Sequence, residues 1–70
     1  MLDEYEYVEL TENLDSTLRA GTRGTVVMVY SSSPPEYEVE FVDRHGNTLA
    51  IRAVKESQLR KVKAADRNGG

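Results

Sequence analysis

The sequence predicts a small all-β domain, either a barrel or a sandwich, and two segments carry this prediction. Residues 21–30 begin with a four-residue turn that has a glycine at each end, and they continue as an apolar run rich in β-branched residues. This pattern is typical of a tight turn that leads into a strand. Residues 37–42 alternate apolar and acidic side chains with a period of two, which indicates a strand with one buried face and one solvated face.

The first strand is expected over residues 5–10, with Val8 and Leu10 on its buried face and Glu9 pointing away. Residues 11–23 are mostly polar and predict a long folded loop. Two leucines of this loop are expected to lie beneath it and to close one end of the core, namely Leu14 and Leu18.

The second strand is expected over residues 24–30. It has no polar residue after Thr25, so we expect that both of its faces are covered or that it crosses the middle of the barrel. Serines and prolines at 31–35 end it, because proline donates no ladder hydrogen bond. The third strand, residues 37–42, places three residues inward, Tyr37, Val39 and Phe41, and two outward, Glu38 and Glu40.

A hairpin turn is expected at residues 43–47, followed by a fourth strand over residues 48–54. The fourth strand alternates two sets of side chains, and the more apolar set, Leu49, Ile51 and Ala53, is expected to face the core. Residues 55–58 suit a 3₁₀ turn, and residues 59–62 suit a short last strand. The predicted domain is therefore residues 1–63, with residues 64–70 as a disordered tail.

Length and composition limit what this chain can be. Its 70 residues make one domain, of a size that buries about 60% of the surface of its unfolded chain. The absence of cysteine excludes disulfides, thiolate nucleophiles and cysteine-based metal sites. No apolar run approaches the ~20 residues that span a bilayer, and the N-terminus is acidic where a signal peptide is basic. We therefore expect a cytoplasmic protein without membrane association.

The formal net charge of −3 conceals two oppositely charged halves. Residues 1–43 carry ten acidic residues and two arginines, a balance of −8, whereas residues 44–70 carry +5. One interpretation is that the halves neutralise each other across neighbouring strands or remain on solvated faces. The other is a charged surface for a partner.

Five short strands, a long first loop and the Gly21-x-x-Gly24-Thr25-Val26-Val27 turn make the chain resemble an SH3-like small barrel. Together with Tyr7-Val8-x-Leu10 and Tyr37-x-Val39-Glu40-Phe41, the order of these motifs resembles a family of small bacterial and cyanobacterial domains of unknown function. The resemblance spans residues 5–62. It implies a fold and no catalytic residue. Some similar proteins are encoded beside toxin-like partners, which implies an accessory or antitoxin-like role.

The segment of residues 21–27 is also similar to the KOW element of ribosomal and transcription-factor barrels, which implies binding to RNA or protein. Nucleic acid is the less favoured partner, because the net charge and the outward glutamates repel a phosphate backbone. A basic face keeps this alternative open, formed by Arg52, Arg60, Lys61 and Lys63.

The residue types of an enzyme or a metal site are not brought together by the sequence. His45 is the only histidine, and it lies at the predicted hairpin turn without an orienting partner. The carboxylates lack the clustered spacing of zinc or calcium ligands, and the glycines precede a strand, whereas phosphate-binding glycines precede a helix. We therefore expect no enzyme, no metal and no cofactor.

The remaining function is a surface for a partner, and the sequence predicts a non-enzymatic protein-binding module. Its candidate binding residues form an aromatic and acidic patch for a basic protein, namely Tyr5, Tyr7, Glu9, Glu12, Asp15 and Tyr30. The alternative is that these tyrosines are half-buried strand residues. A homodimer is a further alternative to a monomer, formed through an exposed edge at residues 37–42 or 59–62.

Overall fold

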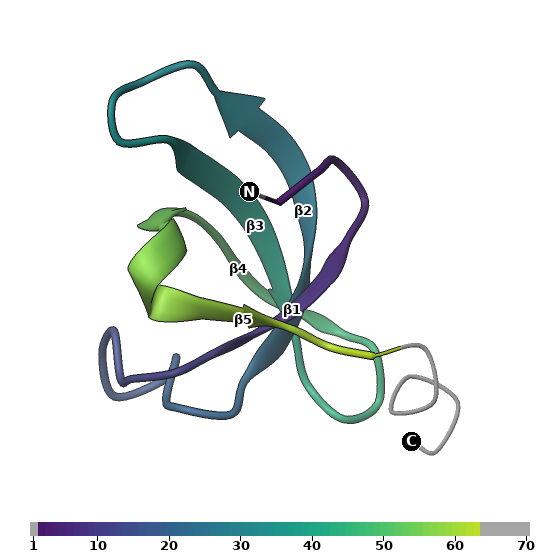
Figure 1. The fold of residues 1–70 in the computed structure, drawn as a ribbon. Helices are drawn as coiled ribbons and strands as arrows, with labels where there is room; N and C mark the ends of the chain where they lie inside the picture. The colour runs from purple at the N-terminus through teal and green to yellow at the C-terminus, as the bar shows by residue number, and fades with distance from the viewer. Residues whose placement is uncertain (1, 64–70) are drawn as a thin grey trace.

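The computed structural model describes residues 2–63 and confirms the all-β architecture with five antiparallel strands, a long first loop and one 3₁₀ turn before the last strand (Figure 1). The elements are β1 (Tyr7–Leu10), β2 (Arg23–Tyr30), β3 (Glu36–Val42), β4 (Thr48–Lys55), the 3₁₀ turn η1 (Glu56–Gln58) and β5 (Leu59–Lys61). The predicted tail at residues 64–70 lies outside the described residues.

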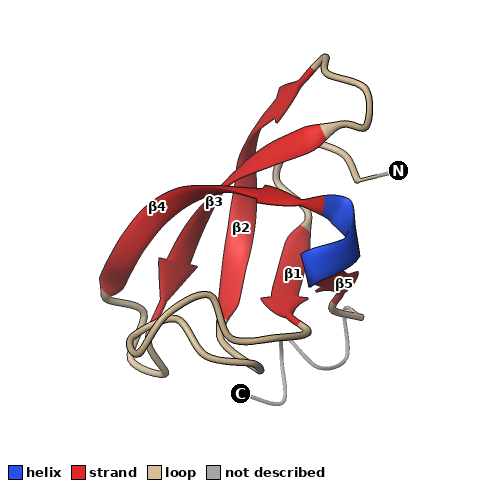
Figure 2. Ribbon diagram, turned by 90° about the vertical axis from the view of Figure 1, so that its left-hand side faces the viewer, coloured by secondary structure: helices blue, strands red, loops and turns tan. Residues whose placement is uncertain are grey.

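The five strands form one curved sheet in the order β4-β3-β2-β1-β5 (Figures 1 and 2). Strands β1 to β4 follow one another as antiparallel neighbours, and β5 returns to pair with β1. The sheet is open, with β4 and β5 at its two edges. The predicted free edge at residues 37–42 is wrong, because this segment is β3 and is hydrogen-bonded to β2 on one side and to β4 on the other.

The core lies on the inner face of the curved sheet. The residues that alternate on β1 and β3 are buried as predicted, and Leu18 of the long loop is buried with them while Leu14 packs against the cluster. The buried hydrophobic residues are Leu2, Val8, Leu10, Leu18, Val26, Tyr37, Val39, Phe41, Val54, Leu59 and Val62. The sequence pattern of period two therefore locates most of the core.

Tyr37 connects this core to two distant segments. Its ring is fully buried, and its hydroxyl accepts a hydrogen bond from the main-chain N–H of Leu2 (3.1 Å) and donates one to Oε1 of Glu56 (2.8 Å). Within residues 2–63 every buried side-chain polar atom has a partner. The phenol thus fixes the N-terminal segment and η1 against the same strand without an unsatisfied polar group.

Gly21 and Gly24 are required for two different structural reasons. Gly21 has a φ of +92°, in the left-handed region that a side chain disfavours. Gly24 lies in the centre of the sheet, where an added Cβ would stand 2.6 Å from the carbonyl oxygen of Glu40 and 2.7 Å from Cγ1 of Val39. Both glycines therefore serve backbone geometry and packing.

The structure corrects the predicted facing of β4. Leu49 and Ile51 are 39% and 55% exposed, whereas Val54 is buried and Ala50 packs against the core. The cause is the β3–β4 register, which pairs Ala50 with Phe41 and Val54 with Tyr37. Because paired residues of antiparallel strands share a face, the set of Leu49, Ile51 and Ala53 faces outward.

Candidate functional site

The carboxylate of Glu9, a predicted binding residue, is held between two arginines of its own chain. Glu9 lies on β1, opposite Arg23 of β2 and Arg60 of β5. Its Oε2 lies 3.4 Å from Nε of Arg23, and its Oε1 forms a short ion pair with the guanidinium of Arg60. Little of its charge is therefore left for a partner.

The carboxylate of Asp15 also forms its hydrogen bonds and ion pair within the chain. Its Oδ1 accepts hydrogen bonds from the main-chain N–H groups of Thr17 and Leu18 (2.8 Å each), and its Oδ2 lies 2.9 Å from Arg52. The Leu18 hydrogen bond, and next the Arg52 side chain, hold the pKa of Asp15 below its ordinary value. Glu12 accepts a longer hydrogen bond from the side chain of Gln58 (3.4 Å).

These ion pairs join the acidic half of the chain to the basic half. Glu9–Arg60 and Glu6–Lys61 connect β1 and the residue before it to β5, and Asp15–Arg52 connects the long loop to β4. The predicted neutralisation between the halves is confirmed for these pairs. The same ion pairs involve three of the four residues of the predicted basic face, namely Arg52, Arg60 and Lys61. The fourth, Lys63, forms no ion pair with another of residues 2–63.

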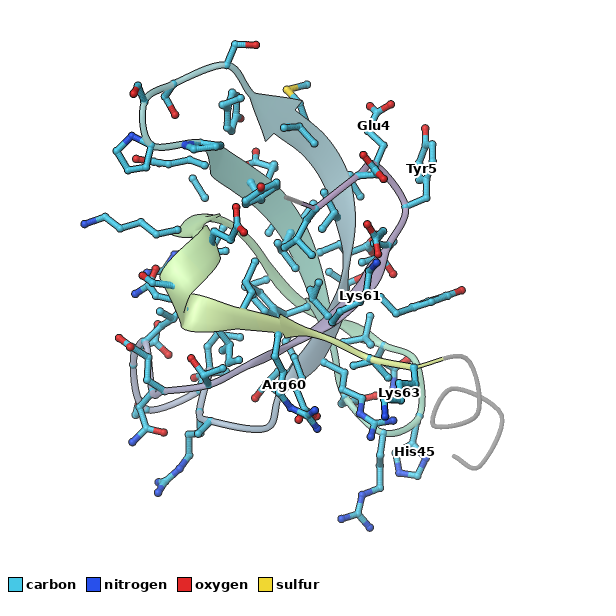
Figure 3. The ribbon with its side chains drawn as sticks, in the orientation of Figure 1. Glu4, Tyr5, His45, Arg60, Lys61 and Lys63 are labelled. Atoms are coloured by element: carbon cyan, nitrogen blue, oxygen red, sulfur yellow. The ribbon has the colours of Figure 1, made fainter. Side chains whose placement is uncertain are left out.

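The three predicted tyrosines do not form one patch. Tyr5 has a φ of 66° and is exposed (Figure 3). With Glu4 it lines a shallow hollow that also includes Met28 and Val29 of β2. Tyr7 on β1 is half-exposed and lines a shallow hollow with residues of β1, β2, β3 and Val62. Tyr30 lies at the far end of β2, five residues beyond the partner of Tyr7, or about 16 Å along the strand.

His45, the only histidine, is exposed on the hairpin turn between β3 and β4 (Figure 3). The turn is shaped by Asp43, whose Oδ1 accepts hydrogen bonds from the main-chain N–H groups of His45 (2.8 Å) and Asn47 (2.9 Å). Among residues 2–63 no cluster of three histidines or carboxylates could hold a metal ion. The arrangement is that of a stable turn.

A different surface brings acidic and apolar side chains together on the outer face of β2 and β3. Cross-strand pairing places Met28 beside Glu38, Tyr30 beside Glu36 and Thr25 beside Glu40. Met28 is 49% exposed and Tyr30 is 38% exposed, so the predicted full cover of β2 is wrong on this face. We call this surface the acidic face and define it as Met28, Tyr30, Glu36, Glu38 and Glu40.

The carboxylates of the acidic face are not neutralised like those of β1. None of the three glutamates forms an ion pair with residues 2–63, although Glu40 accepts a hydrogen bond from the Thr48 hydroxyl (2.6 Å). Desolvation, and after it the charge and hydrogen bond of Glu38, raise the pKa of Tyr30 above its ordinary value. A row of carboxylates without ion pairs therefore lies here beside exposed apolar surface.

Sequence reasoning found part of this face and missed the rest. The outward position of Glu38 and Glu40 followed from the alternation of β3. The position of Met28 depends on a register shift between Val26 and Met28, which places Val26 in the core and Met28 outside, although the two are only two residues apart. No local sequence signal marks this bulge.

Comparison with protein families matches residues 4–61 to a domain of unknown function, DUF4926. The chain belongs to the DUF4926 family. The match spans β1 to β5 and so includes the acidic face. No curated protein and no solved structure matches this DUF4926 chain. Among its described residues there is no helix of the length and apolar character needed to cross a membrane.

Proposed function

We propose that this DUF4926 chain is a non-enzymatic protein-binding module whose acidic face binds a basic segment of a partner protein. One observation carries the proposal: Glu36, Glu38 and Glu40 make no ion pair within residues 2–63 and lie beside the exposed side chains of Met28 and Tyr30. Aromatic residues and methionine are enriched in protein interfaces, and complementary charge accelerates association.

The spacing of the glutamates indicates the form of the partner segment. Alternate residues of a strand repeat about every 6.6 Å on one face, so the three carboxylates form a straight row on β3. Lysines or arginines at alternate positions of an extended segment would match this row. Met28 and Tyr30 would contact the aliphatic stems of those basic side chains.

In this proposal the chain is an accessory or antitoxin-like subunit of the bacterial cytoplasm that covers a basic surface of its partner. The composition supports this compartment, because the sequence has no cysteine and its stability does not depend on disulfides. The acidic face would then act by occupying the partner's basic residues, without any covalent step.

A capture experiment from the native host tests the proposal. The tagged full chain is used with and without nuclease, and it is compared with the double variant Glu36→Lys/Glu38→Lys. The matched control is Glu12→Lys/Ser16→Lys/Thr17→Lys, which makes the same change in net charge on exposed residues of the long first loop. Circular dichroism confirms that all three chains are folded.

We expect a stoichiometric protein that survives nuclease, is retained by the control and is lost with the Glu36→Lys/Glu38→Lys variant. Equal capture by both variants would refute the acidic face as the binding surface. Capture that depends on RNA would replace the proposal with the nucleic-acid-binding alternative.

A further inference from the structure

β4 combines an unpaired edge with an apolar outer face. It is eight residues long and lies at the end of the sheet order, and within residues 2–63 the main chain of residues 48–54 hydrogen-bonds only to β3 (Figure 2). The other edge strand, β5, has only three residues. Long exposed edges are ready templates for pairing with another strand.

The outward side chains of β4 add a second, independent indication. Leu49, Ile51 and Ala53 form an uninterrupted apolar alternation, yet the register turns this set away from the core. A long edge strand with such an apolar set is the kind of strand that pairs with another strand, because apolar cross-strand pairs stabilise the new ladder.

We propose that two copies of this chain pair through their β4 strands, antiparallel and related by a two-fold axis at Ile51, so that their sheets join into one continuous ten-stranded sheet. The pairing rests on β4 alone and is independent of the proposed function of the acidic face.

The β4 sequence is self-complementary in this register. Ile51 lies opposite Ile51 of the second copy, Leu49 lies opposite Ala53, and Arg52 lies opposite Ala50. Each large side chain other than the central isoleucine thus meets a small one. The three apolar pairs would form one stripe across the outer face of the joined sheet.

Charge also favours a second copy as the occupant. A charged residue on an edge strand often prevents pairing with another strand. The charge of Arg52, however, is paired within its own chain, because its guanidinium forms an ion pair with Oδ2 of Asp15 (2.9 Å). The register brings no like charges directly opposite each other. It places Lys55 of one copy opposite Asn47 of the other, on the turn where the Asp43 carboxylate accepts a hydrogen bond from the Asn47 amide (3.2 Å). Lys55 of each copy is thus brought to the turn that carries the Asp43 carboxylate of the other copy.

Site-directed cross-linking tests the register, because the chain has no cysteine of its own. In the proposed dimer the two Cα atoms at position 51 lie about 4.5–5.5 Å apart, within the range of a disulfide. The control position, 53, lies two residues from the axis in each copy, so its two Cα atoms are about 14 Å apart and beyond disulfide reach. Both residues are exposed on the same strand.

We expect Ile51→Cys to give a covalent dimer on mild oxidation and Ala53→Cys to remain monomeric, with both chains folded by circular dichroism. Sedimentation equilibrium of the unmodified chain should show a mass that rises toward that of a dimer with concentration, and Ile51→Lys should abolish this rise. If the measured mass stays that of a monomer at all concentrations, or if the two positions cross-link equally, the proposal is overturned.

Discussion

Gly24 offers the sharpest test of how the sheet is packed. A methyl group at this position would stand 2.6 Å from the main-chain oxygen of Glu40 and 2.7 Å from Cγ1 of Val39. Non-bonded carbon atoms pack at about 3.5–4.0 Å, so Gly24→Ala requires β2 and β3 to separate by up to about 1 Å. Both strands are central in the sheet, and the backbone atom that blocks the methyl group has no rotamer to change.

Overpacking of this kind costs about 1–3 kcal/mol, and we expect Gly24→Ala to lie near the upper end because a main-chain atom is involved. A domain of this length has a free energy of unfolding of about 4–10 kcal/mol, so a large part of its stability would be lost. Each kcal/mol lowers Tm by about 4–8 °C in a domain of this size, which predicts a decrease of roughly 10–20 °C.

The assay is thermal and urea unfolding followed by circular dichroism, with Gly46→Ala as the matched control. Gly46 has a φ of +86°, but no atom lies within 4 Å of its added Cβ. The control therefore measures backbone strain alone, about 1–2 kcal/mol. If Gly24→Ala loses no more stability than Gly46→Ala, the close approach of β2 and β3 at this point is incorrect.

Two further predictions concern the polar contacts that fix the loops. Tyr37→Phe should lower the free energy of unfolding by about 1–2 kcal/mol, because the N–H of Leu2 and the Glu56 carboxylate lose a buried partner; urea unfolding measures this, and an unchanged midpoint would contradict the hydroxyl contacts. The folded-state pKa of Asp15 is held below its ordinary value of 3.8, so its contribution is present above that pH and is lost as the pH falls through the lower folded value. Asp15→Asn should therefore be less stable than the unmodified chain at pH 7, with the difference closing below about pH 4; a difference that persists at lower pH would show that its origin is not the ionised carboxylate.

The sequence predicts the strands well where one alternation is clearly more apolar than the other. On β3, Tyr37, Val39 and Phe41 face glutamates on the other side, so only one facing buries the apolar set. On β4 both alternating sets are largely apolar, and the facing is fixed by the hairpin and by a register shift between Phe41 and Val42. Such a shift leaves no trace in a pattern of period two.

The candidate site was only partly predictable for a related reason. Which carboxylates remain available depends on which cations lie across the neighbouring strand, and this follows from the β1–β5 pairing. Glu9 is adjacent to Arg60 although 51 residues separate them in the sequence. The sequence therefore shows how many acidic residues there are, but not which of their carboxylates are without an ion pair and could bind a partner.

The pairing of β1 with β5 has a consequence for synthesis of the chain on the ribosome. The first strand made is hydrogen-bonded to the last, so Val8 and Leu10 gain their β5 partners only after Leu59 and Lys61 have left the exit tunnel. Until then one edge of β1 is unpaired in the nascent chain, and contacts of such long sequence separation are slow to form. The acidic residues around β1 then have a second use, because their mutual repulsion hinders pairing between neighbouring nascent chains during this interval.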